Sequence, residues 1–334
     1  MNYNRMLFWS VYPVVHYFFT QRPVHPMYRI YIPVLLSFIF LSCEEEFFPD
    51  TTDNTQVIVV EGYIEAGERP ASPYVILTRS QPFFTELGAD ALNNLFVHDA
   101  LVEVSDGERV VQLTELCLAD LSPEQRALAG ALFGFNPDSI GFNFCAYVDL
   151  SQQMPGEIGG RYDLSIQVEG QELSATTTIP DHVPLDSFKF EEPPGEPNDT
   201  LVQMLCYVTD PGGQVNFYRY LTKVNSSPFI SGFTSVIDDR LFDGQEFEFP
   251  LAKAEPRDAP IDPNTFGLYL RGDTVGVKWI NLDEAHYNFW NTLEFNSSNQ
   301  GPFSSYTRVS SNIVGGLGIW GGLSASYYEA IIPD

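Results

Sequence analysis

The sequence predicts an all-β protein built from two β-sandwich (immunoglobulin-like) domains with short helical insertions. Gly (25) and Pro (24) are abundant while charged residues make up only 18%, a mixture that favours strands and turns over long surface helices. Short β-branched or alternating segments recur between turn signals, as in β-sandwiches. The 334 residues are enough for two domains of ordinary size.

The first expected element is a secretory signal peptide at residues 1–42. This segment contains no Asp or Glu, and an apolar run from Ile30 to Leu41 follows Arg29. Twelve helical residues rise about 18 Å, too little for a bilayer core of about 30 Å, so the run predicts a signal rather than a membrane anchor. Because Met27 lies just ahead of Arg29, residues 1–26 are either a mis-assigned upstream extension or a real one.

Cys43 directly follows the apolar run and the small Ser42, which is the arrangement of a bacterial lipobox. We therefore expect cleavage before Cys43 and acylation of its thiol, with palmitate among the acyl chains. The alternative is a plain signal peptide followed by an incidental cysteine, and Phe40 is bulkier than the Leu usual at that position. Residues 43–55 are then a lipidated acidic linker.

Three glutamates, residues 44–46, follow Cys43. They resemble the export tag of surface lipoproteins in some Gram-negative bacteria, although a merely solvated tether would look the same. The predicted localisation is the outer membrane, lipid-anchored and exposed at the cell surface.

Charge excludes further classes of protein. Removing residues 1–42 leaves 14 basic and 44 acidic residues, a formal charge of −30. Such a chain does not hold a polyphosphate backbone by charge, so no nucleic-acid partner is expected. With 44% hydrophobic residues, it is not a disordered acidic tail either.

The first β-sandwich is expected over residues 56–180. Asp106-Gly107 predicts a hairpin turn, because this pair readily supplies positive φ. A short helix is expected from Ser122 to about Phe133, with Ser122 as N-cap and Gln125 at the third helical position. The expected strands are 56–65, 74–80, 100–105, 110–116, 145–149, 159–168 and 172–179.

The second, β-rich domain is expected over residues 181–334. Its one helix, near 282–294, is predicted to begin with Asn281 as N-cap and Glu284 at the third position. The Gly-dense segment 310–322 is predicted to let a strand or turn pass close to another backbone. The expected strands are 187–190, 201–209, 216–225, 233–237, 245–249, 276–281 and 326–331.

Four cysteines are present, and three remain if Cys43 is lipidated. Cys117 and Cys145 flank one insertion in the first domain, so an oxidising compartment would allow them to form a disulfide. Cys206 lies in an apolar run and is interpreted as a small buried hydrophobe. No cysteine or histidine spacing indicates zinc.

Several motifs together resemble a known family. They are VVEGYI (59–64), GGRYDL (159–164), ATTTIP (175–180), DDRLFDG (238–244), LDEAHYNFW (282–290) and SSNIVGGLGIWGG (310–322). With the lipobox and its acidic followers, they resemble the domain of unknown function 4249 family over nearly all of residues 43–334. The resemblance implies a surface or periplasmic lipoprotein, a role beside a TonB-dependent outer-membrane transporter, and no catalytic residues to transfer.

Chemical motifs are few. The chain has no HExxH, GxSxG, P-loop or dinucleotide fingerprint, so it is predicted not to be an enzyme and to need no cofactor; a hydrolase is the remaining alternative. His98 has no motif partner beyond its neighbour Asp99, and His286 is interpreted as a packed or capping histidine.

Asp238, Asp239 and Asp243 are the candidate calcium ligands, because clustered carboxylates suit a hard cation. The competing interpretation is an ordinary turn at Asp243-Gly244. No other metal site is expected.

The predicted function is a non-enzymatic surface lipoprotein that acts as an accessory or substrate-handling partner of a TonB-dependent transporter. The alternative is a free-standing adhesin that binds carbohydrate or glycoprotein, with a glycan or peptide as its ligand. Exposed aromatic platforms would favour the adhesin. The candidates for such a platform are Trp279, Trp290, Trp320, Tyr327 and Tyr328. The competing interpretation is that these side chains pack in the β-cores, which also contain many aromatic residues.

Overall fold

The computed structural model describes residues 56–334 apart from 82–87, 89–91, 93, 134, 196–198, 257–258 and 299–307. Within that part the regular elements are fifteen strands, two α-helices and one 3-10 helix, which confirms the all-β prediction. No helix in the described part is both long and apolar enough to cross a membrane.

The strands of residues 56–180 lie close to their predicted positions. They are β1 (Ile58–Gly67), β2 (Ala71–Arg79), β3 (Leu101–Ser105), β4 (Val110–Cys117), β5 (Cys145–Val148), β6 (Arg161–Val168) and β7 (Gln171–Thr178). The 3-10 helix η1 (Leu118–Asp120) and helix α3 (Pro123–Phe133) lie between β4 and β5.

Residues 181–334 add eight strands and one helix in the described part. They are β8 (Ser187–Glu191), β9 (Leu201–Thr209), β10 (Phe217–Val224), β11 (Val236–Asp238), β12 (Glu246–Pro250), β13 (Tyr269–Leu270), β14 (Thr274–Leu282), α4 (Glu284–Ser298) and β15 (Leu317–Ile331). The sequence did not predict β13, because two residues are too few to show an alternation.

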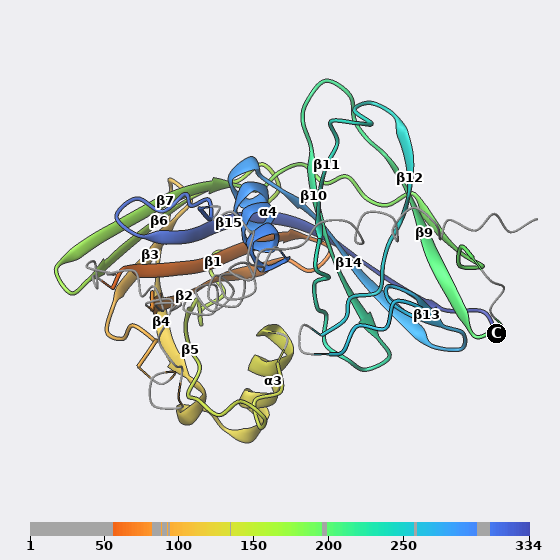
Figure 1. Cartoon of the computed structure of the whole chain (residues 1–334). Coiled ribbons are helices and arrows are strands. Elements are labelled where there is room, and N and C mark those ends of the chain that lie inside the picture. The colour runs from red at the N-terminus through yellow and green to blue at the C-terminus, as the bar shows by residue number, and fades with distance from the viewer. Residues whose placement is uncertain are drawn as a thin grey trace, which may run out of the picture. The chain divides into compact units, whose positions relative to one another are not determined.

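One long sheet contains strands from both halves of the chain (Figure 1). Its order is β11-β10-β14-β15-β1-β2-β5-β4-β3-β6-β7, and a four-stranded sheet of β12, β9, β13 and β8 is separate from it. β15 lies parallel to β1 and antiparallel to β14, so it joins the two halves by backbone hydrogen bonds. The division into two β-sandwiches stays a prediction.

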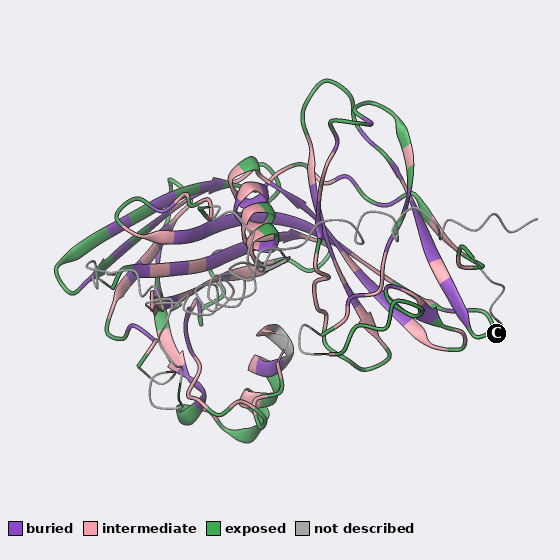
Figure 2. Cartoon of the chain, viewed as in Figure 1, coloured by how far each residue is buried: buried purple, intermediate pink, exposed green. Residues whose placement is uncertain are grey.

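Two large apolar cores are present: the first packs on the long sheet, and the second joins the long sheet to the four-stranded sheet. The first gathers inward side chains of β1, β2, β3, β4, β6 and β7, and the second those of β9, β10, β12 and β14. Figure 2 shows the buried residues concentrated along the central strands. Trp320 of β15 belongs to the first core and donates from Nε1 to the carbonyl of Tyr162 on β6 (3.0 Å).

The Gly-dense segment is where β15 differs from its prediction. The strand begins at Leu317, nine residues earlier than expected, because the glycines themselves pair with β1. Gly318 has φ +112°, and a Cβ placed on it would lie 1.9 Å from the carbonyl oxygen of Val60. The predicted close passage of two backbones is therefore confirmed.

Of the two predicted helix N-caps, the structure confirms one and contradicts the other. Ser122 caps α3 as predicted: Gln125 N donates to its Oγ (3.3 Å), and Ser122 N donates to Gln125 Oε1 (2.9 Å). The prediction that Asn281 caps the second helix is wrong. β14 continues through Leu282, and Asp283 is the cap, with His286 N donating to its Oδ1 (2.7 Å).

Candidate functional site

Cys43, the predicted lipidation site, lies outside the described residues, as do the signal peptide and the linker. The structure therefore leaves lipidation a prediction. The other predicted site residues are all described, and they fall into separate regions of the fold.

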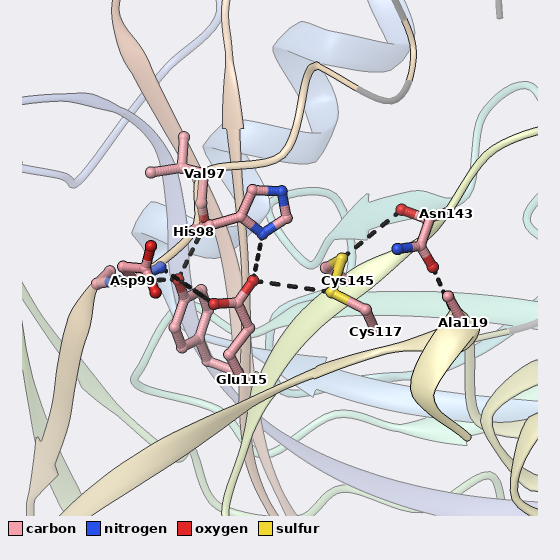
Figure 3. Close-up of a disulfide and its surroundings, with 10 residues drawn as sticks. Val97, His98, Asp99, Glu115, Cys117, Ala119, Asn143 and Cys145 are labelled. Carbon is pink, nitrogen blue, oxygen red and sulfur yellow. Dashed lines mark hydrogen bonds and ion pairs between the residues drawn. A yellow bond between two sulfur atoms is a disulfide. The ribbon is translucent and has the colours of Figure 1, made fainter. Parts of the chain in front are cut away.

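Cys117 at the end of β4 and Cys145 at the start of β5 are directly opposite each other, and their sulfurs form a disulfide. The bond joins residues 28 positions apart and closes the loop that carries η1 and α3. Figure 3 shows Asn143 beside it, whose Oδ1 accepts from Ala119 N (2.9 Å). The insertion is thus tied at its base by covalent and hydrogen bonds.

Glu115 of β4 organises the polar groups next to this disulfide (Figure 3). Its carboxylate contacts His98 Nδ1 (2.5 Å) and accepts from Asp99 N (3.1 Å) and the Tyr147 hydroxyl (3.3 Å). Burial, with the negative charge of Glu115, raises the pKa of Tyr147 to about 12. Sequence reasoning missed this partner of His98 because the two residues are 17 positions apart. Both neighbouring sulfurs are in the disulfide, so they offer no thiolate for a metal.

A buried ion pair fixes α4 against β10. The guanidinium of Arg219 lies 3.5 Å from the ring centroid of Trp290 and 3.8 Å from Glu294 Oε1. Glu294 also accepts hydrogen bonds from the Ser235 amide (2.7 Å) and hydroxyl (2.5 Å). Burial lowers the pKa of Arg219 from its usual value. Since every charged group here has a partner, we assign this cluster a structural role.

His286 of α4 is a packed histidine, as predicted. It is 1% exposed and stacks on Tyr63 with ring centroids 5.1 Å apart. A Cβ on Gly321 would come within 2.5 Å of its Nδ1, so this glycine provides the room for the ring. Burial, with the nearby positive charge of Arg219, lowers the pKa of His286 to about 3, so the ring is neutral at physiological pH.

The predicted calcium ligands are not all together. Asp239 and Asp243 lie in one cluster with Asp210, a residue that was not among the predicted ligands. Asp238 instead accepts from the Tyr287 hydroxyl (2.9 Å) and pairs with Arg240 (3.2 Å). The only signal for Asp210 in the sequence is the Asp210-Pro211-Gly212-Gly213 turn directly after the strand 201–209, and a turn of this composition does not by itself indicate a ligand.

Each carboxylate of this acidic cluster (Asp210, Asp239 and Asp243) is held by the backbone or side chains around it. Asp210 accepts from the Tyr218 hydroxyl (2.5 Å) and from Gly244 N (3.1 Å). Asp239 Oδ2 accepts from Asn216 N (2.7 Å) and Nδ2 (3.2 Å). Asp243 Oδ1 accepts from Gly213 N (3.0 Å). Burial and the two neighbouring carboxylates raise the pKa of Asp239.

The comparison with family models decides the classification. The model of the domain of unknown function 4249 (DUF4249) matches residues 44–329, which is most of the chain. The chain belongs to the DUF4249 family. A search of curated proteins finds no match. Membership in DUF4249 carries no stated activity, so the function has to be argued from the residues.

The aromatic residues that could serve a glycan site in this DUF4249 protein are largely internal. Trp279 and Trp320 are fully buried. Trp290 is partly buried beneath Arg219. Tyr327 and Tyr328 are also partly buried, and their hydroxyls bond Glu65 (2.6 Å) and the Leu185 carbonyl (3.3 Å). These side chains therefore pack the protein instead of forming an open platform.

Proposed function

We propose that the mature chain is a non-enzymatic lipoprotein, anchored in the outer membrane through lipid on Cys43 and exposed at the cell surface. There it serves as an accessory or substrate-handling partner of a TonB-dependent transporter. The observation that carries the proposal is the sequence from Arg29 to Glu46, in which an apolar run, Ser42-Cys43 and three glutamates follow one another.

The separation between anchor and fold supports this role. Twelve residues lie between Cys43 and Gln56, where the described fold begins. Fully extended, they reach at most about 43 Å. The β-fold is thereby kept near the membrane surface, where a transporter's external loops lie. More than one acyl chain makes such an anchor stable.

The three described histidines lie in contacts within the fold, and Ser326, the hydroxyl partner of His182, is only 1% exposed. His98 contacts Glu115, His182 Nε2 lies 2.7 Å from Ser326 Oγ, and His286 is buried against Tyr63. Each one is engaged in a structural contact, and the proposal gives none of them a chemical step.

The test is affinity purification of the tagged full chain from detergent-solubilised outer membranes, with mass spectrometry of what co-purifies. We expect a TonB-dependent transporter in stoichiometric amount. The matched control is Cys43→Ser, which should be recovered from the soluble fraction without the transporter.

The proposed stable partnership is contradicted if the wild-type chain is recovered alone from membranes in which the transporter is expressed. The adhesin would then be the favoured function. A glycan array probed with the same preparation would test that alternative.

A further inference from the structure

Two turns that are distant in sequence meet at the acidic cluster. Asp210 directly follows β9, at the start of one turn. Asp239 and Asp243 lie in the loop that follows β11. Gly212 and Gly244 bring the turns together: a Cβ built on either would lie 3.1 Å from the Cα of the other. A larger residue at either position would push the two turns apart by a few tenths of an ångström.

The carboxylates converge at the spacing a single large cation requires. One oxygen from each of Asp210, Asp239 and Asp243 lies within 4.8 Å of the other two. Calcium–oxygen distances are about 2.3–2.6 Å, so two oxygens on opposite sides of one ion are about 5 Å apart. All three oxygens therefore fit around one Ca²⁺.

An unpartnered buried oxygen is the second, independent observation. Asp239 is 1% exposed, and its Oδ1 has no hydrogen-bond partner among the described residues. Its Oδ2 already accepts two hydrogen bonds from Asn216, so Oδ1 is the atom left for a ligand. A buried carboxylate oxygen without a partner is unfavourable unless a cation or donor satisfies it.

The local charge balance points the same way. Asp210 is also buried, at 3% exposed, so two of three neighbouring carboxylates are withdrawn from water. Arg240 on the same loop pairs with Asp238 instead. Within the described part of the chain, none of the three cluster carboxylates forms an ion pair.

The donor set selects among cations. The cluster offers only carboxylate oxygens, whereas zinc sites draw on nitrogen and sulfur. Magnesium demands near-ideal octahedral geometry at about 2.1 Å, while calcium accepts six to eight oxygens in flexible arrangements. Asp243 is exposed, so water has access to complete the coordination.

We propose that Asp210, Asp239 and Asp243 bind one Ca²⁺ ion that ties the turn after β9 to the loop after β11. The site differs from the one predicted from sequence, since Asp210 takes the place of Asp238. The bound ion links β9 of the four-stranded sheet to β11, the edge strand of the long sheet.

Terbium luminescence tests this on the full chain purified in detergent. Tb³⁺ takes the place of Ca²⁺ at oxygen sites and emits when an excited aromatic ring is close to it. Tyr218 donates to Asp210 and stacks on Trp279 with centroids 5.0 Å apart, so the site has its own sensitiser. We expect sensitised emission from Tb³⁺ that Ca²⁺ displaces, and a melting temperature roughly 5 °C higher in saturating calcium than in EGTA.

Two variants and a matched control locate the site. Asp243→Asn changes an exposed side chain, so it should fold normally and weaken calcium binding at least about tenfold. Asp239→Asn should abolish the calcium-dependent rise in melting temperature, yet melt in EGTA no lower than the wild type, because it removes a repelling buried charge. Asp238→Asn, the neighbouring carboxylate outside the cluster, should bind calcium as the wild type does.

The proposal is overturned if calcium leaves the melting temperature of the full chain unchanged, or if Asp238→Asn weakens binding as much as Asp243→Asn does. It is equally overturned if Asp239→Asn lowers the melting temperature by the same amount in calcium and in EGTA, since that result means a purely structural carboxylate. None of these outcomes depends on the transporter partnership.

Discussion

Buried ionisable side chains are the feature that sequence patterns reveal least. The packed position of His286 could be predicted, because it lies on the apolar face of a recognisable helix. The site-forming role of Asp210 could not, since it depends on two turns meeting around Gly212 and Gly244. The partner of Arg219 was equally hidden, because Glu294 lies 75 positions further along the chain.

His286 should make stability depend on pH in the acid range. Its pKa is about 3 in the folded chain and about 6.5 when unfolded, so the unfolded state binds the extra proton first. The contribution is therefore fully present above about pH 6.5 and is lost as the pH falls toward 3. Between pH 7 and 5 the wild type should lose about 2 kcal/mol more unfolding free energy than His286→Gln.

Urea denaturation of both proteins at pH 7, 6 and 5 measures this difference. Parallel curves for wild type and His286→Gln would contradict the buried neutral ring.

At the scale of single elements, local signals were reliable where a side chain and its partner are close in sequence. The hairpin of β3 and β4 forms at Asp106-Gly107, where Arg109 N donates to Asp106 Oδ1 (2.7 Å), as the turn chemistry indicates. The α4 start was mispredicted because Asn281 has a distant partner: its Oδ1 accepts from Val183 N (2.7 Å), 98 residues away. Two cap-forming residues two positions apart, Asn281 and Asp283, look alike until that contact is known.

The disulfide should stabilise the α3 insertion as an element. Joining Cys117 to Cys145 closes a loop with a separation of 28 residues, and the chain-entropy model then gives a loss of about 3.5 kcal/mol for the double variant Cys117→Ala/Cys145→Ala. Limited proteolysis should cut the variant within residues 118–144 first. The control is Cys206→Ala, a free buried cysteine, which should leave that segment protected; equal cleavage in all three proteins would contradict the prediction.

At the scale of the whole described fold, long-range pairing explains what the sequence could not show. Most strands were predictable from alternation and turn residues, and the all-β class followed from them. The parallel pairing of β15 with β1 joins residues about 258 positions apart, such as Val59 and Leu317, and no local pattern encodes it. The Gly-dense tail indicated a close passage but not its partner.

Gly318 is the position at which a single substitution should disturb the pairing of β1 with β15 most. In Gly318→Ala the new Cβ meets the Val60 carbonyl oxygen at 1.9 Å and the residue keeps φ near +112°, so overpacking and backbone strain together should remove at least about 3 kcal/mol of unfolding free energy. Gly107→Ala is matched to it, because Gly107 also has positive φ (+91°) but nothing within 4 Å of the added Cβ; it should lose only about 1–2 kcal/mol. Urea denaturation compares the two. Equal losses would mean that backbone strain alone matters and that β1 and β15 have room to separate, whereas a larger loss in Gly318→Ala shows that their close contact holds the two halves of the chain together.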